Sequence, residues 1–126
     1  MTRAFMVEEL DVRIFDDVDS LARAAADAAV VAITGAIATR GHANVMLATG
    51  NSQLKFLDLL VARRGIDWRL VTAFHMDEYV GIADTHPASF QRYMRERVAA
   101  RLPLRAFYYV SGAGDPEAEA ERYGSL

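Results

Sequence analysis

The sequence has no cysteine, a single lysine and no long uninterrupted apolar run. The absence of cysteine excludes a disulfide scaffold, a cysteine-based zinc site and a cysteine nucleophile. The longest weakly polar stretch, Ala22–Thr39, is mostly alanine and is interrupted by Arg23, Asp27 and Thr34. Alanine favours helices and anchors poorly in lipid, so this stretch predicts a buried helix rather than a membrane span.

The charge balance and the first residues also exclude some classes of protein. Fourteen basic and 17 acidic residues give a net charge of −3, which argues against general binding to nucleic acid. Residues 1–10 carry Arg3, Glu8 and Glu9 and do not resemble a signal peptide, so we expect a cytoplasmic protein. A length of 126 residues, 52% of them apolar, suits one globular domain.

The first half of the chain predicts a strand, a long helix and a second strand. Leu10–Phe15 alternates apolar and charged residues, as a half-exposed strand does. Asp16 or Asp17 can cap a helix that runs to Arg40 and ends at Gly41. The apolar run Asn44–Ala48 predicts a strand covered on both faces. The helix places these residues on one face: Leu21, Ala25, Ala28, Ala32 and Ala36.

The alternation continues to the last residue. The further predicted elements are a helix ending at Gly65, a strand at Arg69–Met76, a helix whose first turn holds Pro87, a strand at Ala106–Val110, and a helix from Asp115 that is still running at Leu126. Such a βαβαβαβα order predicts an α/β fold with a mainly parallel sheet and helices on both faces. Ligands of these folds bind beyond the carboxyl ends of the strands, which nominates the segments after Ala48 and Met76.

The turn Thr49-Gly50-Asn51-Ser52 leads from a buried strand into a helix. Gly50 allows close backbone approach, two hydroxyls are available, and the unpaired N–H groups of a helix start attract anions such as phosphate. The turn matches neither G-x-G-x-x-G nor a Walker A loop, and an ordinary turn with Ser52 as N-cap explains it as well. Lys55 is near enough to reach a phosphate, although solvation is the more common state of such a lysine.

The acids Asp77 and Glu78 follow the third predicted strand directly. A carboxylate partly shielded from water at this edge has a raised proton affinity and can act as a general base, while a helix cap or a salt bridge are the structural alternatives. Adjacent residues cannot share one strand face, and we favour Asp77 over Glu78 although periodicity does not decide. His75 and His86 lack regular ligand spacing, so no metal is expected. His86 fits a helix cap or, like Glu78, the lining of the cleft.

A basic stretch follows, spread around the predicted helix and away from Phe90, Met94 and Val98. This spacing indicates a solvated face rather than a nucleic-acid contact. Its members are Arg92, Arg95, Arg97, Arg101 and Arg105.

Three segments resemble the glucosamine-6-phosphate deaminase/isomerase family, which is related to the 6-phosphogluconolactonases. They are LATGNSQLKFLDLL (47–60), VTAFHMDEYVGI (71–82) and HPASFQRYM (86–94). The resemblance implies a parallel, Rossmann-like three-layer sheet, of which residues 1–126 would be the N-terminal half, a single sugar-phosphate isomerase-like domain truncated at its C-terminus. It also implies that no cofactor is needed.

The same resemblance assigns roles to the candidate residues. The phosphate loop falls on Thr49, Gly50, Asn51 and Ser52, and the base that moves a proton between C2 and C1 of the opened sugar falls on Asp77. The usual loop is richer in glycine and threonine and is commonly followed by proline. The departures at Asn51 and Gln53 therefore leave the preferred sugar phosphate open.

The function implied is conversion of glucosamine 6-phosphate to fructose 6-phosphate and ammonia. A 6-phosphogluconolactonase-type hydrolase and a non-catalytic sugar-phosphate sensor are the alternatives. The ring-opening residues of the family belong to a second half that these 126 residues lack, so we expect little activity from this chain alone. The expected partner is a small sugar phosphate, with neither nucleic acid nor membrane, and a homo-oligomer stays open.

Overall fold

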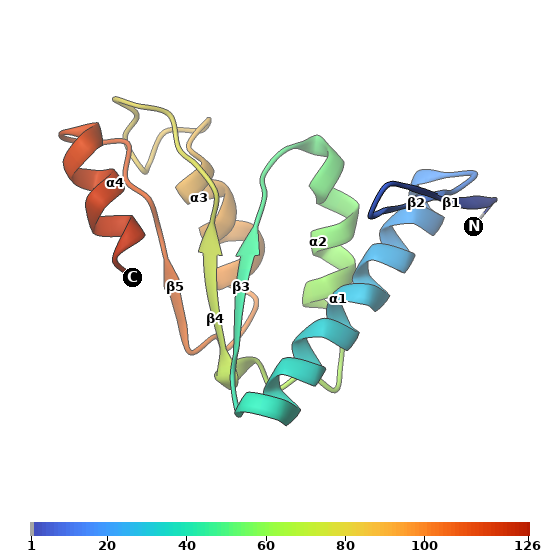
Figure 1. The fold of residues 1–126 in the computed structure, drawn as a ribbon. Helices are drawn as coiled ribbons and strands as arrows, with labels where there is room; N and C mark the ends of the chain where they lie inside the picture. Colours follow the sequence, from blue (N-terminus) through green and yellow to red (C-terminus); the bar gives the residue numbers. More distant parts are fainter. Residues whose placement is uncertain (1) are drawn as a thin grey trace.

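The computed structural model of the protein describes residues 2–126 (Figure 1). Strands β3 (Ala43–Leu47), β4 (Val71–His75) and β5 (Ala106–Tyr108) form a parallel sheet in the order β3-β4-β5. Four helices surround it: α1 (Val18–Arg40), α2 (Leu54–Val61), α3 (Phe90–Met94) and α4 (Pro116–Gly124), as counted over the described part of the chain. The predicted α/β class with a parallel sheet is confirmed.

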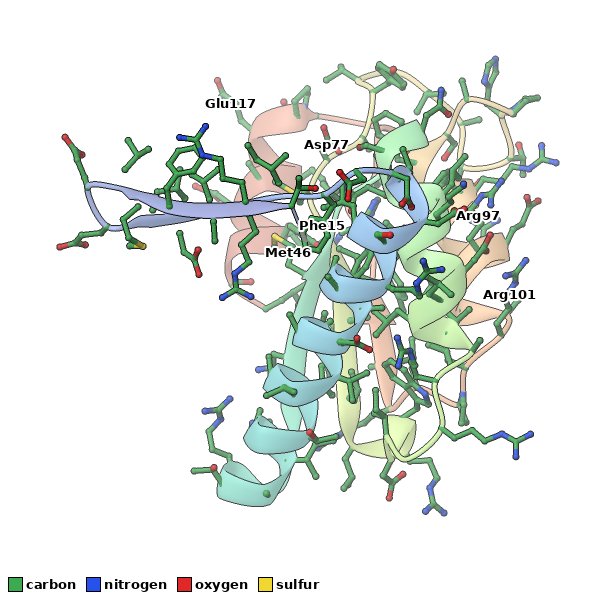
Figure 2. All side chains as sticks on the ribbon, turned by 90° about the vertical axis from the view of Figure 1, so that its right-hand side faces the viewer. Phe15, Met46, Asp77, Arg97, Arg101 and Glu117 are labelled. Atoms are coloured by element: carbon green, nitrogen blue, oxygen red, sulfur yellow. The ribbon has the colours of Figure 1, made fainter. Side chains whose placement is uncertain are left out.

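The helices cover both faces of this sheet. Helices α2 and α3 lie on one face and α4 on the other, while α1 runs beside the outer strand β3 (Figure 1, Figure 2). The two parallel crossovers, β3-α2-β4 and β4-α3-β5, place their helices on one face, and α4 on the other face completes a three-layer arrangement. The buried apolar core lies between the sheet, α1, α2 and α3, and its members are Ile33, Ala43, Leu47, Leu57, Leu60, Ile66, Trp68, Val71, Met94 and Val98.

The strand predicted at Leu10–Phe15 exists but does not join the parallel sheet. It forms β2 (Leu10–Ile14) and pairs antiparallel with β1 (Arg3–Val7), which the sequence pattern did not predict. The turn between them is Glu8-Glu9, with Glu8 in the left-handed region at φ 53°. The expectation that this strand belongs to the mainly parallel sheet is therefore wrong, because a neighbouring segment supplies a local partner for β2.

Helix α1 has the predicted ends. The Asp17 carboxylate accepts a hydrogen bond from the Ser20 N–H at 2.7 Å, and Gly41 closes the helix at φ 79°. The predicted buried face is wrong: of its five residues only Ala36 is half-buried, and Leu21 is 48% exposed. The residues of α1 that are buried are Ala22, Ala26 and Ile33. An alanine-rich helix carries small apolar residues all round, so periodicity does not single out the face that packs.

Helix α1 is also long and apolar enough, by length and composition alone, to cross a membrane. In this structure it packs against α2 and β3. Core helices of soluble domains commonly meet the same criteria, so its composition is weak evidence for a span.

Three predicted helix boundaries shift. The helix expected from Pro87 begins at Phe90, where the Ser89 hydroxyl accepts from the Arg92 N–H at 3.2 Å, and it continues through a π-helical turn at Arg95–Ala99. The helix after the turn 49–52 ends at Val61 rather than near Gly65. The last helix starts after Asp115, as expected, but ends at Gly124 instead of continuing to Leu126.

Candidate functional site

Two candidate segments leave the sheet at the same edge. Strands β3 and β4 are parallel, and Leu47 at the end of one stands opposite His75 at the end of the other. Thr49 and Asp77 each follow two residues later. The register therefore brings the turn 49–52 and the acids 77–78 to the carboxyl edge of neighbouring strands, where ligands of α/β folds bind.

The turn after β3 differs from an ordinary capped helix start. Gly50 adopts φ 116°, a conformation that favours glycine, and open space lies where a Cβ would project. A 3₁₀ turn at Asn51–Gln53 then precedes α2, and neither it nor α2 has a side-chain cap. The alternative in which Ser52 is the N-cap is therefore wrong. Thr49 is half-buried, while Gly50, Asn51 and Ser52 are exposed.

Lys55 lies on the exposed side of α2, where a carboxylate rather than a phosphate is its partner. Its ammonium pairs with the Asp19 carboxylate on α1. Lys55 is therefore a solvent-exposed surface residue, as predicted.

Asp77 is exposed, and the structure records no hydrogen bond to its carboxylate from any described residue. Strand β4 ends at His75, so the chain leaves the covered sheet before Asp77, and Met76 next to it is 61% exposed. The partial shielding from water that we expected is thus wrong for these residues. What remains is an accessible carboxylate at the predicted edge of the sheet (Figure 2).

Glu78 turns back toward the protein and caps α3. Its carboxylate accepts hydrogen bonds from the Ser89 hydroxyl at 2.7 Å, from the N–H groups of Phe90 and Gln91 at 2.9 Å, and from the N–H of Tyr79 at 3.0 Å. Burial disfavours the charged form, but these hydrogen bonds outweigh it and lower the pKa of Glu78 below its ordinary value. The helix-cap alternative therefore applies to Glu78, and Asp77 is the acid left open to a ligand.

Helix α3 contacts both candidate segments. Its first residues hold Glu78, and one turn later the Tyr93 hydroxyl donates to the Gly50 carbonyl at 3.3 Å. The Arg97 guanidinium lies 5.2 Å from the centre of the Tyr93 ring. Sequence reasoning missed Ser89 and Tyr93. A serine just before an apolar helix is a recognisable N-cap signal, whereas nothing in the pattern marks Tyr93.

His75 is fully buried at the end of β4. Its Nε2 accepts from the Val110 N–H at 2.9 Å, and its Nδ1 has no partner among residues 2–126. Burial lowers the pKa of His75, and the charges of Glu78 and Asp77 oppose this only in part. The Tyr123 hydroxyl on α4 accepts from the His75 N–H at 3.1 Å and donates to the His75 carbonyl at 2.6 Å.

His86 has a local role in the described structure. It is exposed, and its Nδ1 accepts from the Ala88 N–H at 3.0 Å, so it caps a turn before α3 rather than α3 itself. Within residues 2–126 there is no cluster of three or more histidine, aspartate and glutamate side chains arranged to hold a metal ion.

Two hollows adjoin the edge without being lined by Asp77. One, of about 530 Å³, lies between α1 and β3 and reaches Ala48, Gln53 and Met76, the neighbours of both candidate segments. The other, of about 420 Å³, lies at the start of α1 and includes Ser52. Of the predicted site residues, only Ser52 contributes to either lining.

The basic stretch is a solvated face, as predicted. Arg92 pairs with Glu96 at 2.9 Å, and Arg101 pairs with Asp58 at 3.0 Å. Arg95 lies 3.4 Å from Asp84. Three of the five arginines of this stretch thus pair with neighbouring acids.

Comparison with known proteins adds to this geometry. The family of glucosamine-6-phosphate isomerases/6-phosphogluconolactonase matches residues 16–126. The chain belongs to this family. The match includes both candidate segments and α3, and begins after the β1–β2 hairpin.

Relatives within the glucosamine-6-phosphate isomerase/6-phosphogluconolactonase family include glucosamine-6-phosphate deaminases. That of Exiguobacterium sp. is 35% identical over 81 residues, which are 64% of this chain and 32% of the relative. That of Streptococcus pneumoniae (strain 70585) is 33% identical over 87 residues, which are 68% of this chain and 37% of the relative. The chain therefore spans about a third of the length of these enzymes.

Solved structures of the family share the fold. A monomeric glucosamine-6-phosphate deaminase has a TM-score of 0.79 at 24% identity, over 89% of this chain and 47% of its own. A 6-phosphogluconolactonase from Shewanella baltica OS155 has a TM-score of 0.76 at 25% identity, over 88% of this chain and 48% of its own. These likenesses confirm the predicted Rossmann-like fold.

Proposed function

We propose that this chain carries the phosphate turn and the base of an amino-sugar-phosphate isomerase/deaminase that converts glucosamine 6-phosphate to fructose 6-phosphate and ammonia. One observation carries the proposal. The exposed Asp77 carboxylate and the turn 49–52 leave neighbouring parallel strands at one edge, with Leu47 opposite His75. The relatives named glucosamine-6-phosphate deaminase support the choice of substrate.

The turn 49–52 supplies binding in this proposal. Gly50 lets a phosphate approach the backbone, and the hydroxyls of Thr49 and Ser52 are donors beside it. Binding at the phosphate, remote from the reacting carbons, orients the sugar so that C2 meets the base. The Tyr93 hydroxyl donates to the Gly50 carbonyl and so fixes the position of the turn relative to α3.

Asp77 supplies the proton transfer. In the opened sugar, its carboxylate removes the proton from C2, and the electron pair forms an enol-type intermediate with C1. The proton returns at C1, and the resulting imine at C2 takes up water and releases ammonia. Glu78 does not compete for this role, because four donors already engage its carboxylate.

A lactonase is the second candidate, because the lactonase from Shewanella baltica has nearly the same structural similarity as the deaminase. Its reaction is a hydrolysis in which the same turn would hold the phosphate. A sensor domain would use the turn for binding alone. The three functions differ in ligand preference and in whether a carbon-bound proton exchanges.

The test measures binding and proton exchange separately. Calorimetric titration compares glucosamine 6-phosphate with 6-phosphogluconolactone, and NMR in D₂O follows loss of the C2 proton of glucosamine 6-phosphate. We expect preferential binding of the amino sugar phosphate, with exchange that Asp77→Asn abolishes while binding persists. Glu117→Gln, a change of an exposed carboxylate on α4, is the matched control and should leave both unchanged.

Each contrary result has a distinct meaning. Preference for the lactone would favour the hydrolase, and binding without exchange would favour the sensor. Exchange that survives Asp77→Asn would remove Asp77 from the role of base. We expect little ammonia release from the 126-residue chain, and release at ordinary enzyme rates would contradict that expectation.

A further inference from the structure

Helix α3 is attached to both segments of the candidate site within one of its turns. Helices α2 and α3 lie on the same face of the sheet (Figure 1), and the Tyr93 hydroxyl donates to the Gly50 carbonyl at 3.3 Å. Three residues earlier on α3, the Phe90 N–H donates to the Glu78 carboxylate at 2.9 Å. The turn 49–52 is therefore anchored to the same helix that the acidic segment holds.

The Gly50 carbonyl accepts two hydrogen bonds, which together fix the peptide unit that follows it. Besides the Tyr93 hydroxyl, the Gln53 N–H donates to this carbonyl at 3.0 Å and closes the 3₁₀ turn. A peptide unit is planar, and its C=O and N–H point in opposite directions, so the Asn51 N–H points away from both donors. Within the described chain, the N–H groups of Asn51 and Ser52 have no acceptor. They are the unpaired donors that a helix start offers to an anion.

We propose that Tyr93 is a positioning residue, which holds the Gly50 carbonyl and thereby directs the Asn51 N–H at the phosphate of the substrate. This inference rests on the proposed function, in which the turn 49–52 binds that phosphate, and it adds the backbone donor and the residue that orients it. Without the Tyr93 hydroxyl, the Gln53 N–H alone would hold this carbonyl, and a glycine peptide rotates easily. The cost of ordering the donor would then fall on phosphate binding and reduce the affinity.

The surroundings of Tyr93 keep its hydroxyl in place. The ring packs against the buried core and lies 5.2 Å from the guanidinium of Arg97, which belongs to the π-helical turn that follows. The Tyr93 N–H donates to the Ser89 carbonyl at 3.0 Å. Burial raises the pKa of Tyr93 above its ordinary value, so the hydroxyl stays protonated, as a donor must. Replacing tyrosine by phenylalanine removes the hydroxyl and keeps these other contacts.

The test is titration of the 126-residue chain with inorganic phosphate, followed through the backbone amide signal of Asn51 in NMR spectra. Phosphate should shift this signal in the original chain. Tyr93→Phe should weaken phosphate binding about two- to tenfold, the range that one hydrogen bond accounts for.

Tyr109→Phe is the matched control, because it removes the same atom from another half-buried tyrosine. The Tyr109 hydroxyl makes no hydrogen bond within the described chain, and only its backbone carbonyl accepts one, from Arg122. Tyr109→Phe should therefore leave the phosphate affinity unchanged. The urea denaturation midpoints of the Tyr93→Phe and Tyr109→Phe chains should be similar, which separates a loss of orientation from a loss of fold.

Two changes at Asn51 test whether Tyr93 acts through the Asn51 N–H. Asn51→Pro deletes this N–H at the first position of the helical segment, where proline fits, and Gly50 before it has ψ 166°, an extended value that a residue before proline favours. Asn51→Ala removes the side chain and keeps the N–H, so the proline variant should bind phosphate about two- to tenfold more weakly than the alanine variant. In the Asn51→Pro background, Tyr93→Phe should cause no further loss, because the donor that Tyr93 orients is absent.

The possible results separate this inference from the proposed function. If Tyr93→Phe leaves the phosphate affinity unchanged, or lowers it equally with and without Asn51→Pro, the role of Tyr93 is overturned while the turn 49–52 keeps its proposed role. If phosphate binds without shifting the Asn51 amide signal, Asn51 is not the donor and the inference is likewise overturned. A chain that binds no phosphate at any tested concentration overturns the binding role of the turn in the proposed function, and this inference with it.

Discussion

Replacing Glu78 by glutamine tests how the acidic edge is held together. The glutamate carboxylate receives four hydrogen bonds, from Ser89, Phe90, Gln91 and Tyr79, at 2.7–3.0 Å. Hydrogen bonds to a charged group contribute about 1.5–3 kcal/mol each, and solvent screening reduces this for a half-buried carboxylate. The amide keeps one acceptor oxygen and turns an NH₂ group toward N–H donors. We expect a loss of about 2–3 kcal/mol in the free energy of unfolding.

Urea and thermal unfolding at pH 7, followed by circular dichroism, measure this loss. For a domain of this size it corresponds to a drop in Tm of about 6–12 °C. Glu117→Gln is the control and should shift the free energy of unfolding by less than about 0.5 kcal/mol. A double-mutant cycle with Ser89→Ala should give a coupling of about 1 kcal/mol, because the two side chains share one hydrogen bond.

The pH dependence gives an independent check of Glu78. Because folding lowers the pKa of Glu78, its contribution is complete above the unfolded value of about 4.3 and is lost as pH falls through the lower folded value. Glu78→Gln should therefore remove part of the acid-induced loss of stability below about pH 4.3. A variant as stable as the original chain at pH 7, with the same slope in acid, would refute the capping role.

Three further changes probe the surroundings of the same edge. Burial lowers the pKa of His75 in the fold, so its protonation in the unfolded chain should reduce the free energy of unfolding as the pH falls below the unfolded value of about 6.5, and His75→Gln should flatten this slope in urea titrations. Gly112→Ala places a Cβ 2.1 Å from the Tyr79 carbonyl and should cost about 1–3 kcal/mol in thermal unfolding, whereas Gly124→Ala, where a Cβ meets open space, should not cause this loss. Tyr123→Phe removes both hydrogen bonds to the His75 backbone and should cost about 1–3 kcal/mol, an effect that an unchanged denaturation midpoint would contradict.

The parts of the fold that the sequence predicted depend on short-range signals. Asp17 and Gly41 mark the ends of α1 because a carboxylate cap and a left-handed glycine act within one turn. The parallel direction of β3, β4 and β5 followed from the alternation of strands and helices. The register of β3 and β4 then fixed the common edge at which the turn 49–52 and Asp77 lie.

The parts that the sequence did not predict depend on partners distant along the chain. Helix α3 begins at Phe90 rather than near Pro87, because Glu78 binds the N–H groups at its start. The same contact determines that Glu78 is engaged and that Asp77 is the acid left open to a ligand. The alternation of residues along a strand does not reveal this, because Ser89 lies eleven residues after Glu78. The exposure of Asp77 likewise depends on where β4 stops being covered.

The cap formed by Glu78 affects where this chain can accept inserted residues. One carboxylate joins Tyr79 to the start of α3, so residues 79–88 form a loop with both ends pinned. Lengthening such a loop costs only about 0.6 kcal/mol for each doubling, because the closure entropy grows slowly. Insertions within the loop would therefore leave Asp77 and α3 in place, which makes residues 82–86 the natural position for an inserted reporter peptide.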